Sequence, residues 1–100
     1  MRIVIVGQAW FGAEALRLCL RREHQVVKVL APASTGEEYD RLYAVALQAG
    51  VLVAHCGRRV GTGDIPAGTD LILAAHAHAF IDAGARSAAR LGALGYAPKW

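Results

Sequence analysis

Short apolar runs alternate with helical patterns along this chain, and the alternation predicts an α/β fold. Five runs have the length and composition of strands, and they cover residues 2–6, 25–30, 51–54, 70–75 and 93–96. Strands that are apolar throughout are typical of parallel sheets covered on both faces. The order β-α-β-α-β-β-α-β therefore predicts a small Rossmann-like domain with a mostly parallel sheet.

Three helices are expected between these runs. The first covers residues 12–22. The second begins at Thr35, because Thr35 and Glu38 have the spacing of a capping box, and it ends at Gly50. The third covers residues 81–91, and the Gly- and Arg-rich segment 56–69 before it is expected to be a loop. The residues expected to face the core are Phe11, Ala15, Leu16, Leu18, Cys19, Leu20, Leu42, Val45, Ala46, Ala49, Ile81, Ala85, Ala88 and Ala89.

The composition limits the class of protein. Of the 100 residues, 55% are hydrophobic and 19% are charged, which supplies the core of one domain, residues 1–100, and excludes a disordered chain. The formal charge is only +3, and no dense basic face with interleaved aromatic residues is present, so we do not expect nucleic-acid binding. No apolar run approaches the roughly 20 residues of a membrane-spanning helix.

The two cysteines and the first residues bear on metal binding and on the compartment. Cys19 and Cys56 share no zinc-ligand spacing, so no metal site is expected. Reduced thiols suit a cytoplasmic protein. Met1 runs directly into the first strand, without the basic and apolar regions of a signal peptide. We therefore expect a cytoplasmic protein with no membrane partner.

The first candidate site is the turn after the first strand. Gly7, Ala9 and Gly12 form a variant of the dinucleotide fingerprint GxGxxG, at the start of a helix whose N-terminal amides favour anions. Ala9 and the two aromatic residues after it crowd the place of a pyrophosphate. In addition, Pro32 closes the second strand where a ribose-binding acid is expected. A nucleotide- or dinucleotide-binding module remains open, as does a tight turn without a ligand.

The second candidate site is the segment from Ala74 to Ile81, which follows the strand at 70–75. Because this strand is parallel to the first, the segment is expected at the same carboxyl edge of the sheet. His76 and His78 have side chains that titrate near neutral pH and could transfer a proton. A polar loop whose imidazole rings bond to the backbone is the alternative, and a metal would need a third ligand.

These segments resemble a known family. The opening MRIVIVGQAWFGAEALRLCLRREHQVVKVLAP resembles the start of formyltransferases that use 10-formyltetrahydrofolate. Within this family, the opening resembles methionyl-tRNA formyltransferase and the N-terminal domain of 10-formyltetrahydrofolate dehydrogenase. Both begin with a strand, a G-x-x-x-F-G turn and a helix, as residues 2–22 are expected to do here. Residues 70–81 resemble the strand and loop that line the pteridine pocket of that family with backbone groups. The resemblance spans essentially all 100 residues, and it covers the first half of the family's catalytic domain.

The resemblance implies a truncated formyltransferase-type fold and the transfer of a formyl group from 10-formyltetrahydrofolate to an amine. It implies two groups of folate-binding residues. They are Gly7, Gln8, Phe11 and Gly12 in the first turn, and Ala75, His76, Ala77, His78, Ala79, Phe80 and Ile81 in the second loop.

The catalytic signature of that family, Asn-x-His-Pro-Ser-Leu-Leu-Pro, is not matched. Gly95 and Ala97 stand at the Asn and His positions, and the catalytic Asp of the family lies beyond the matched region. Neither side chain can donate to an oxyanion or transfer a proton. We therefore expect no catalytic residue, no metal and no formyl transfer by this chain alone.

The strand at 93–96 is the last element expected. Its outer edge is expected to be exposed or paired in trans, because an edge strand presents unpaired backbone groups. A homo-oligomer, or a non-catalytic half-domain completed by a partner chain, therefore remains open beside the small-molecule folate as partner.

Overall fold

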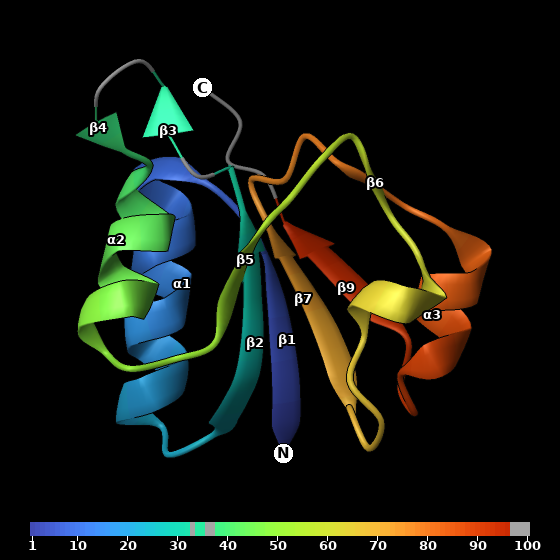
Figure 1. Ribbon diagram of the computed structural model, residues 1–100. Coiled ribbons are helices and arrows are strands. Elements are labelled where there is room, and N and C mark those ends of the chain that lie inside the picture. Colours follow the sequence, from blue (N-terminus) through green and yellow to red (C-terminus); the bar gives the residue numbers. More distant parts are fainter. Residues whose placement is uncertain (33, 36–37, 97–100) are drawn as a thin grey trace.

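A five-stranded parallel sheet forms the centre of the protein (Figure 1). The computed structural model describes residues 1–32, 34–35 and 38–96. The strand order is β5-β2-β1-β7-β9, and each neighbouring pair is parallel. The strands are β1 (Arg2–Gly7), β2 (Gln25–Ala31), β5 (Val53–His55), β7 (Leu71–Ala75) and β9 (Ala93–Tyr96). The predicted small Rossmann-like α/β fold is confirmed.

Helices cover both faces of this sheet. Figure 1 shows α1 (Ala9–Arg21) and α2 (Arg41–Gln48) together on one side, and α3 (Ala83–Ala88) on the other. The short 3-10 helix η1 (Thr62–Asp64) packs beside α3. Two small pairs complete the described elements. They are the antiparallel pair β3 (Ser34–Thr35) and β4 (Glu38–Tyr39), and the parallel pair β6 (Arg59–Val60) and β8 (Phe80–Ile81).

The central strand β1 is buried on both sides, which explains its unbroken apolar run. Ile3 and Ile5 belong to the core on the α1–α2 side, whereas Val4 and Val6 belong to the core on the α3 side. All four are at most 4% exposed. Alternate residues of a strand point to opposite faces, so a strand in the middle of a three-layer fold needs apolar residues at every position.

The predicted start of the second helix is wrong. Thr35 lies in β3 and pairs with Glu38 of the antiparallel strand β4, instead of capping a helix. The helix begins later because the Asp40 carboxylate caps it. That carboxylate accepts hydrogen bonds from the backbone N–H groups of Leu42 at 3.0 Å and Tyr43 at 3.4 Å.

The ends of the other two helices also differ from the prediction. The first begins at Ala9, three residues early, with Gln8 in extended conformation before it. The third is shorter than residues 81–91, because Ile81 pairs with Val60 in the β6–β8 ladder and Asp82 caps α3. The strand expected at 51–54 is shifted to β5, and the expected loop 56–69 contains β6 and η1.

Some residues predicted to face the core do not. Leu18 and Leu20 are 47% and 38% exposed, because α1 buries a narrower stripe that includes Leu16 and Cys19. Ala49 lies after the end of α2 and is exposed. The predicted burial of Cys19 is confirmed.

The last described strand lies at the edge of the sheet. Within the described residues, β9 pairs only with β7, so its other side forms the outer edge of the sheet, as expected. Among residues 1–32, 34–35 and 38–96, no helix has the length and apolar character needed to cross a lipid bilayer.

Candidate functional site

A cleft of about 270 Å³ opens at the carboxyl edge of the sheet, where the chain leaves the neighbouring strands β1 and β7. From β1 the chain continues through α1 to β2 on one side, and from β7 it continues through α3 to β9 on the other. Such a change of direction is where open α/β sheets bind ligands. The residues that line the cleft are Val6, Gly7, Gln8, Pro32, Cys56, Gly57, Arg58, Ala77, His78 and Ala79.

The two glycines of the first turn lie close against neighbouring elements of the fold. A Cβ atom on Gly7 would lie 2.2 Å from the backbone oxygen of Ala75, on the adjacent strand. A Cβ atom on Gly12 would lie 2.9 Å from Cδ2 of Leu42, where α1 packs on α2. Real Cβ atoms essentially never make contacts under 3.0 Å, so a Cβ atom on Gly7 would force the backbone to shift, whereas the end of the Leu42 side chain could move away from one on Gly12. Packing therefore explains Gly7 without a ligand, and Gly12 lies where α1 packs closely on α2.

A carboxylate already occupies the start of α1. The backbone N–H of Ala9 donates to Oδ1 of Asp40 at 2.9 Å, and the other oxygen of Asp40 caps α2. Ala9 itself has a φ of 59°, a left-handed conformation that most non-glycine residues avoid. The amide that a pyrophosphate would use thus binds a negative side chain, which would also repel an incoming phosphate.

The second predicted segment forms one wall of the cleft. Ala77, His78 and Ala79 line it, after His76 turns the chain with a φ of 58°. The imidazole rings of His76 and His78 lie 5.3 Å apart at an angle of 59°. The backbone groups of Ala77, His78 and Ala79 make no hydrogen bond to any other residue that the structure describes. They are therefore available to a ligand.

The cleft has a third wall, beside the first turn and the segment 77–79, and it was not identified from the sequence. Cys56, Gly57 and Arg58 follow β5, whose parallel direction brings them to the same edge as the other two segments. Position after a parallel strand was the signal that could have identified them. Burial, and secondly the charge of Asp64, raises the pKa of the Cys56 thiol, which donates a hydrogen bond to the carbonyl oxygen of Gly57 at 3.3 Å. This thiol is protonated and weakly nucleophilic at neutral pH.

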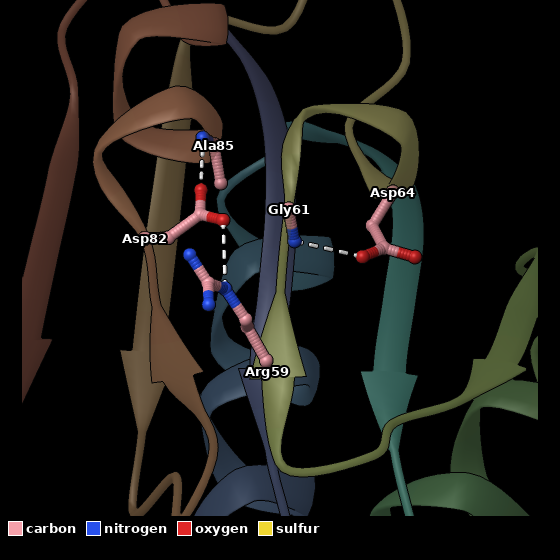
Figure 2. Close-up of polar contacts among 5 residues, drawn as sticks. All are labelled: Arg59, Gly61, Asp64, Asp82 and Ala85. Atoms are coloured by element: carbon pink, nitrogen blue, oxygen red, sulfur yellow. Dashed lines mark hydrogen bonds and ion pairs between the residues drawn. The ribbon is translucent and has the colours of Figure 1, made fainter.

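Backbone hydrogen bonds and the Arg59–Asp82 ion pair, which Figure 2 shows, form a polar clasp between the second and third walls. The backbone N–H of Phe80 donates to the carbonyl oxygen of Arg58 at 2.8 Å, and that of Asp82 donates to Val60 at 3.0 Å. Nε of Arg59 lies 3.1 Å from Oδ2 of Asp82. Figure 2 shows the Asp82 carboxylate between this guanidinium and the N-terminus of α3.

The clasp has two further supports. The backbone N–H of Ala85 donates to Asp82 at 2.8 Å, and this bond, followed by the contact with Arg59, lowers the pKa of the Asp82 carboxyl. The carboxylate of Asp64 accepts a hydrogen bond from the N–H of Gly61 at 2.9 Å (Figure 2). Both walls are thus held in place by contacts that leave the cleft itself free.

The remaining predicted site residues lie around the cleft. Phe11 lines a separate apolar hollow between α1 and β7. Ala75 is buried beside Gly7 on the adjacent strand, and Phe80 is 61% exposed on β8. Ile81 packs against the core on the α3 side. The cleft therefore brings together residues of both predicted groups, with the first group represented by Gly7 and Gln8.

The positions that correspond to catalytic residues in the resembled family are at the edge strand or beyond it. Gly95 lies in β9 and is exposed, and Ala97 lies outside the described residues. Within residues 1–32, 34–35 and 38–96, no group of three or more His, Cys, Asp or Glu side chains could hold a metal ion.

Comparisons with known proteins assign no family. No protein-family model matches this chain, and no curated protein matches it.

The residues that line the cleft indicate what kind of ligand it can bind. Its walls combine small apolar side chains with unpaired backbone groups, the amide of Gln8, the imidazole of His78 and the guanidinium of Arg58. Small apolar side chains with a few polar groups are typical of sites that bind small molecules.

Proposed function

We propose that this chain binds the heterocyclic end of a reduced folate, of the 10-formyltetrahydrofolate class, in the cleft at the carboxyl edge of the sheet. The observation that carries the proposal is the backbone of Ala77, His78 and Ala79, which lines the cleft without a partner among the described residues. Ala77 and Ala79 are half-buried and His78 is exposed, so solvent reaches these backbone groups and a ligand can take its place. The edge of a pteridine offers donors and acceptors side by side, so it can bond to them.

The size and charge of the cleft support this choice of ligand. Its volume of about 270 Å³ is just below the roughly 300–1,000 Å³ of most small-molecule sites. It therefore has room for one fused ring system, with the rest of the ligand outside. Arg58 is the charged side chain among its lining residues, and a guanidinium favours the carboxylates that folates carry.

A dinucleotide fits the same features less well. The amide of Ala9 binds the Asp40 carboxylate, in the place where a pyrophosphate would bind. Pro32 lines the cleft in the place where an acid would hold the ribose hydroxyls. Both features favour an uncharged ring over a phosphate in the recess.

The proposed activity is binding without turnover. Formyl transfer needs a donor for the oxyanion and a group that moves a proton. Gly95 has no side chain that could donate to the oxyanion, and the methyl group of Ala97 cannot move a proton. The purified chain, given 10-formyltetrahydrofolate and a range of amines, should therefore transfer formyl groups at the background rate. Transfer above background would contradict this part of the proposal.

Calorimetric titration with 5-formyltetrahydrofolate, and separately with NAD, tests the binding. The folate should bind and NAD should not. Substitution of Gly57 with Leu should weaken folate binding at least about tenfold, because Gly57 lines the cleft and a Cβ atom there meets no protein atom within 4 Å. Gly63→Leu is the matched control, since Gly63 is equally open but lies in η1, away from the cleft.

Thermal unfolding gives an independent measurement. A ligand that binds only the native state stabilises it by about 2.7 kcal/mol at a concentration of 100 Kd. A shift with NAD and none with the folate would refute the proposal, and so would equal folate affinities of the Gly57 and Gly63 variants.

A further inference from the structure

The mouth of the cleft carries three basic side chains. Arg58 and His78 line the cleft and are exposed, so they lie at its mouth and not deep in the recess. They come from neighbouring segments, because the parallel pairing of β6 with β8 begins shortly after them, at Arg59 and Phe80. The imidazole ring of His76 lies 5.3 Å from that of His78. We refer to Arg58, His76 and His78 as the basic rim.

The basic rim has no acidic partner in the described part of the chain. The guanidinium of Arg58 and the ring nitrogens of His76 and His78 make no hydrogen bond or ion pair with another described residue. The adjacent Arg59, by contrast, is paired with Asp82. Among the described residues that line the cleft, none is acidic. An unpaired guanidinium beside such a recess favours an anionic group on the ligand.

The other groups around the imidazole rings carry little charge into the cleft. Burial, followed by the charge of Asp64, raises the pKa of the Cys56 thiol, which is therefore protonated and neutral. Asp64 itself lies in η1 and does not line the cleft. The first turn and the end of β2 contribute Gln8 and Pro32, which are uncharged. The charge that a ligand meets at the mouth thus comes mainly from Arg58 and from the protons on the two imidazoles.

The spacing of the imidazole rings couples these protons to an anion. Imidazole side chains gain and lose a proton between about pH 5 and 8. Two rings 5.3 Å apart repel each other when both are charged, so the pair without a ligand resists full protonation. A carboxylate bound beside them favours the charged form of each ring. Its binding therefore takes up a proton from solvent onto an imidazole nitrogen.

We infer that the basic rim is an anion site for the carboxylate-bearing tail of the ligand, and that this tail binds together with a proton. The inference rests on the proposed function, because a folate ring in the recess leaves its tail at the mouth of the cleft. By linkage, a reaction that takes up protons is favoured as the pH falls. Affinity should therefore rise from pH 8 to pH 5.5, a range in which carboxylates remain ionised.

Calorimetric titration with 5-formyltetrahydrofolate, in two buffers of different ionisation enthalpy, measures this proton directly. At pH 6.5 the unmodified chain should take up about 0.2–0.4 proton per ligand bound. The dissociation constant should fall about two- to fivefold between pH 8 and pH 5.5, which is the size expected for an exposed ion pair. The control ligand is 5-formyl-6-methyltetrahydropterin, which has the same ring without carboxylates and should show neither effect.

Substitutions in the basic rim separate its members. The double variant His76→Gln/His78→Gln should still bind the folate, but without proton uptake or pH dependence. His24→Gln is its control, because His24 lines a hollow at the amino edge of the sheet. Arg58→Gln should weaken folate binding about two- to fivefold at every pH and leave the control ligand unaffected. Arg86→Gln, in α3 and outside the cleft, should behave as the unmodified chain.

The outcomes distinguish this inference from the proposed function. Folate binding without proton uptake would overturn the inference alone, and so would equal uptake with the control ligand or uptake that persists in the double histidine variant. Absence of folate binding at every pH would refute the proposed function and the inference together. Because the proton uptake is measured on the unmodified chain, the result does not depend on whether a variant folds.

Discussion

Substitution of Gly7 with Ala tests whether the first turn of this protein is dictated by packing. Gly7 is the last residue of β1 and pairs in register with Ala75 of β7. The added Cβ atom would lie 2.2 Å from the backbone oxygen of Ala75, against a limit of 3.0 Å for real contacts. The obstacle is the backbone of the neighbouring strand β7, so it cannot rotate away as a side chain would. The two strands must separate by about 0.8 Å, or the chain must bend.

The expected loss of stability follows from two opposing effects. Overpacking of a dense interior costs about 1–3 kcal/mol, and a backbone obstacle belongs at the upper end of that range or above it. Replacing Gly with Ala also restricts the unfolded chain, which stabilises the protein by about 0.4–1 kcal/mol. The net loss should be about 2–3 kcal/mol. For a domain of this size that lowers the Tm by about 10–20 °C.

Thermal and urea unfolding followed by circular dichroism measure this loss. Gly57→Ala is the control, because a Cβ atom there meets nothing within 4 Å and the residue needs no left-handed conformation. It should leave the free energy of unfolding within about 0.5 kcal/mol of the parent value. If Gly7→Ala were as stable as Gly57→Ala, the argument that this glycine serves packing would be refuted.

Three further substitutions test contacts around the site. Asp40→Ala should lower the free energy of unfolding by about 2 kcal/mol in urea titrations, because it removes the α2 cap and the acceptor for the Ala9 amide; a loss below about 0.5 kcal/mol would contradict this. Ala9→Gly should be neutral or stabilising by up to about 1 kcal/mol, since relief of the left-handed conformation outweighs the added freedom of the unfolded chain; a clear loss of stability would show that Ala9 is not strained. Bonds from Ala85 and then Arg59 lower the folded pKa of Asp82, so its contribution to stability is complete above the ordinary carboxyl value of about 3.9 and is lost as the pH falls through the lower folded value. Asp82→Asn should therefore flatten the decline of Tm with pH in that acidic range, and an unchanged acid profile would contradict the role of the clasp.

The strands of the sheet could be predicted from the sequence because burial on both faces leaves a continuous apolar run. Residues 2–6 and 70–75 correspond closely to β1 and β7, and their parallel order follows from the helices between them. The predicted position of the site at the carboxyl edge followed from the same topology. These features depend on local patterns that few tertiary contacts can override.

The helix boundaries failed where a tertiary contact decided the outcome. Thr35 and Glu38 have a good capping-box spacing, yet Asp40 starts the helix. Asp40 bonds the N-terminus of α1 as well as that of α2, and the bond to Ala9 crosses 31 positions of the chain. No window of local sequence contains both partners. The predicted burial of Leu18 failed for another reason, because α1 buries a narrower stripe that includes Leu16 and Cys19.

The cleft shows which parts of a motif carry information about a ligand. Gly7 and Gly12 drew attention to the first turn, but the backbone of β7 leaves no room for a side chain at Gly7, and Gly12 lies where α1 packs on α2. A glycine in a strand-to-helix turn is thus compatible with a bound phosphate, a bound ring or no ligand at all. What distinguishes these cases is the state of the polar groups around the turn. The Ala9 amide is already bound to Asp40, whereas the backbone of residues 77–79 has no partner in the described part of the chain. A ligand of this protein should therefore be recognised from the second loop, and substitutions that fill the cleft there should change affinity while leaving the turn at Gly7 intact.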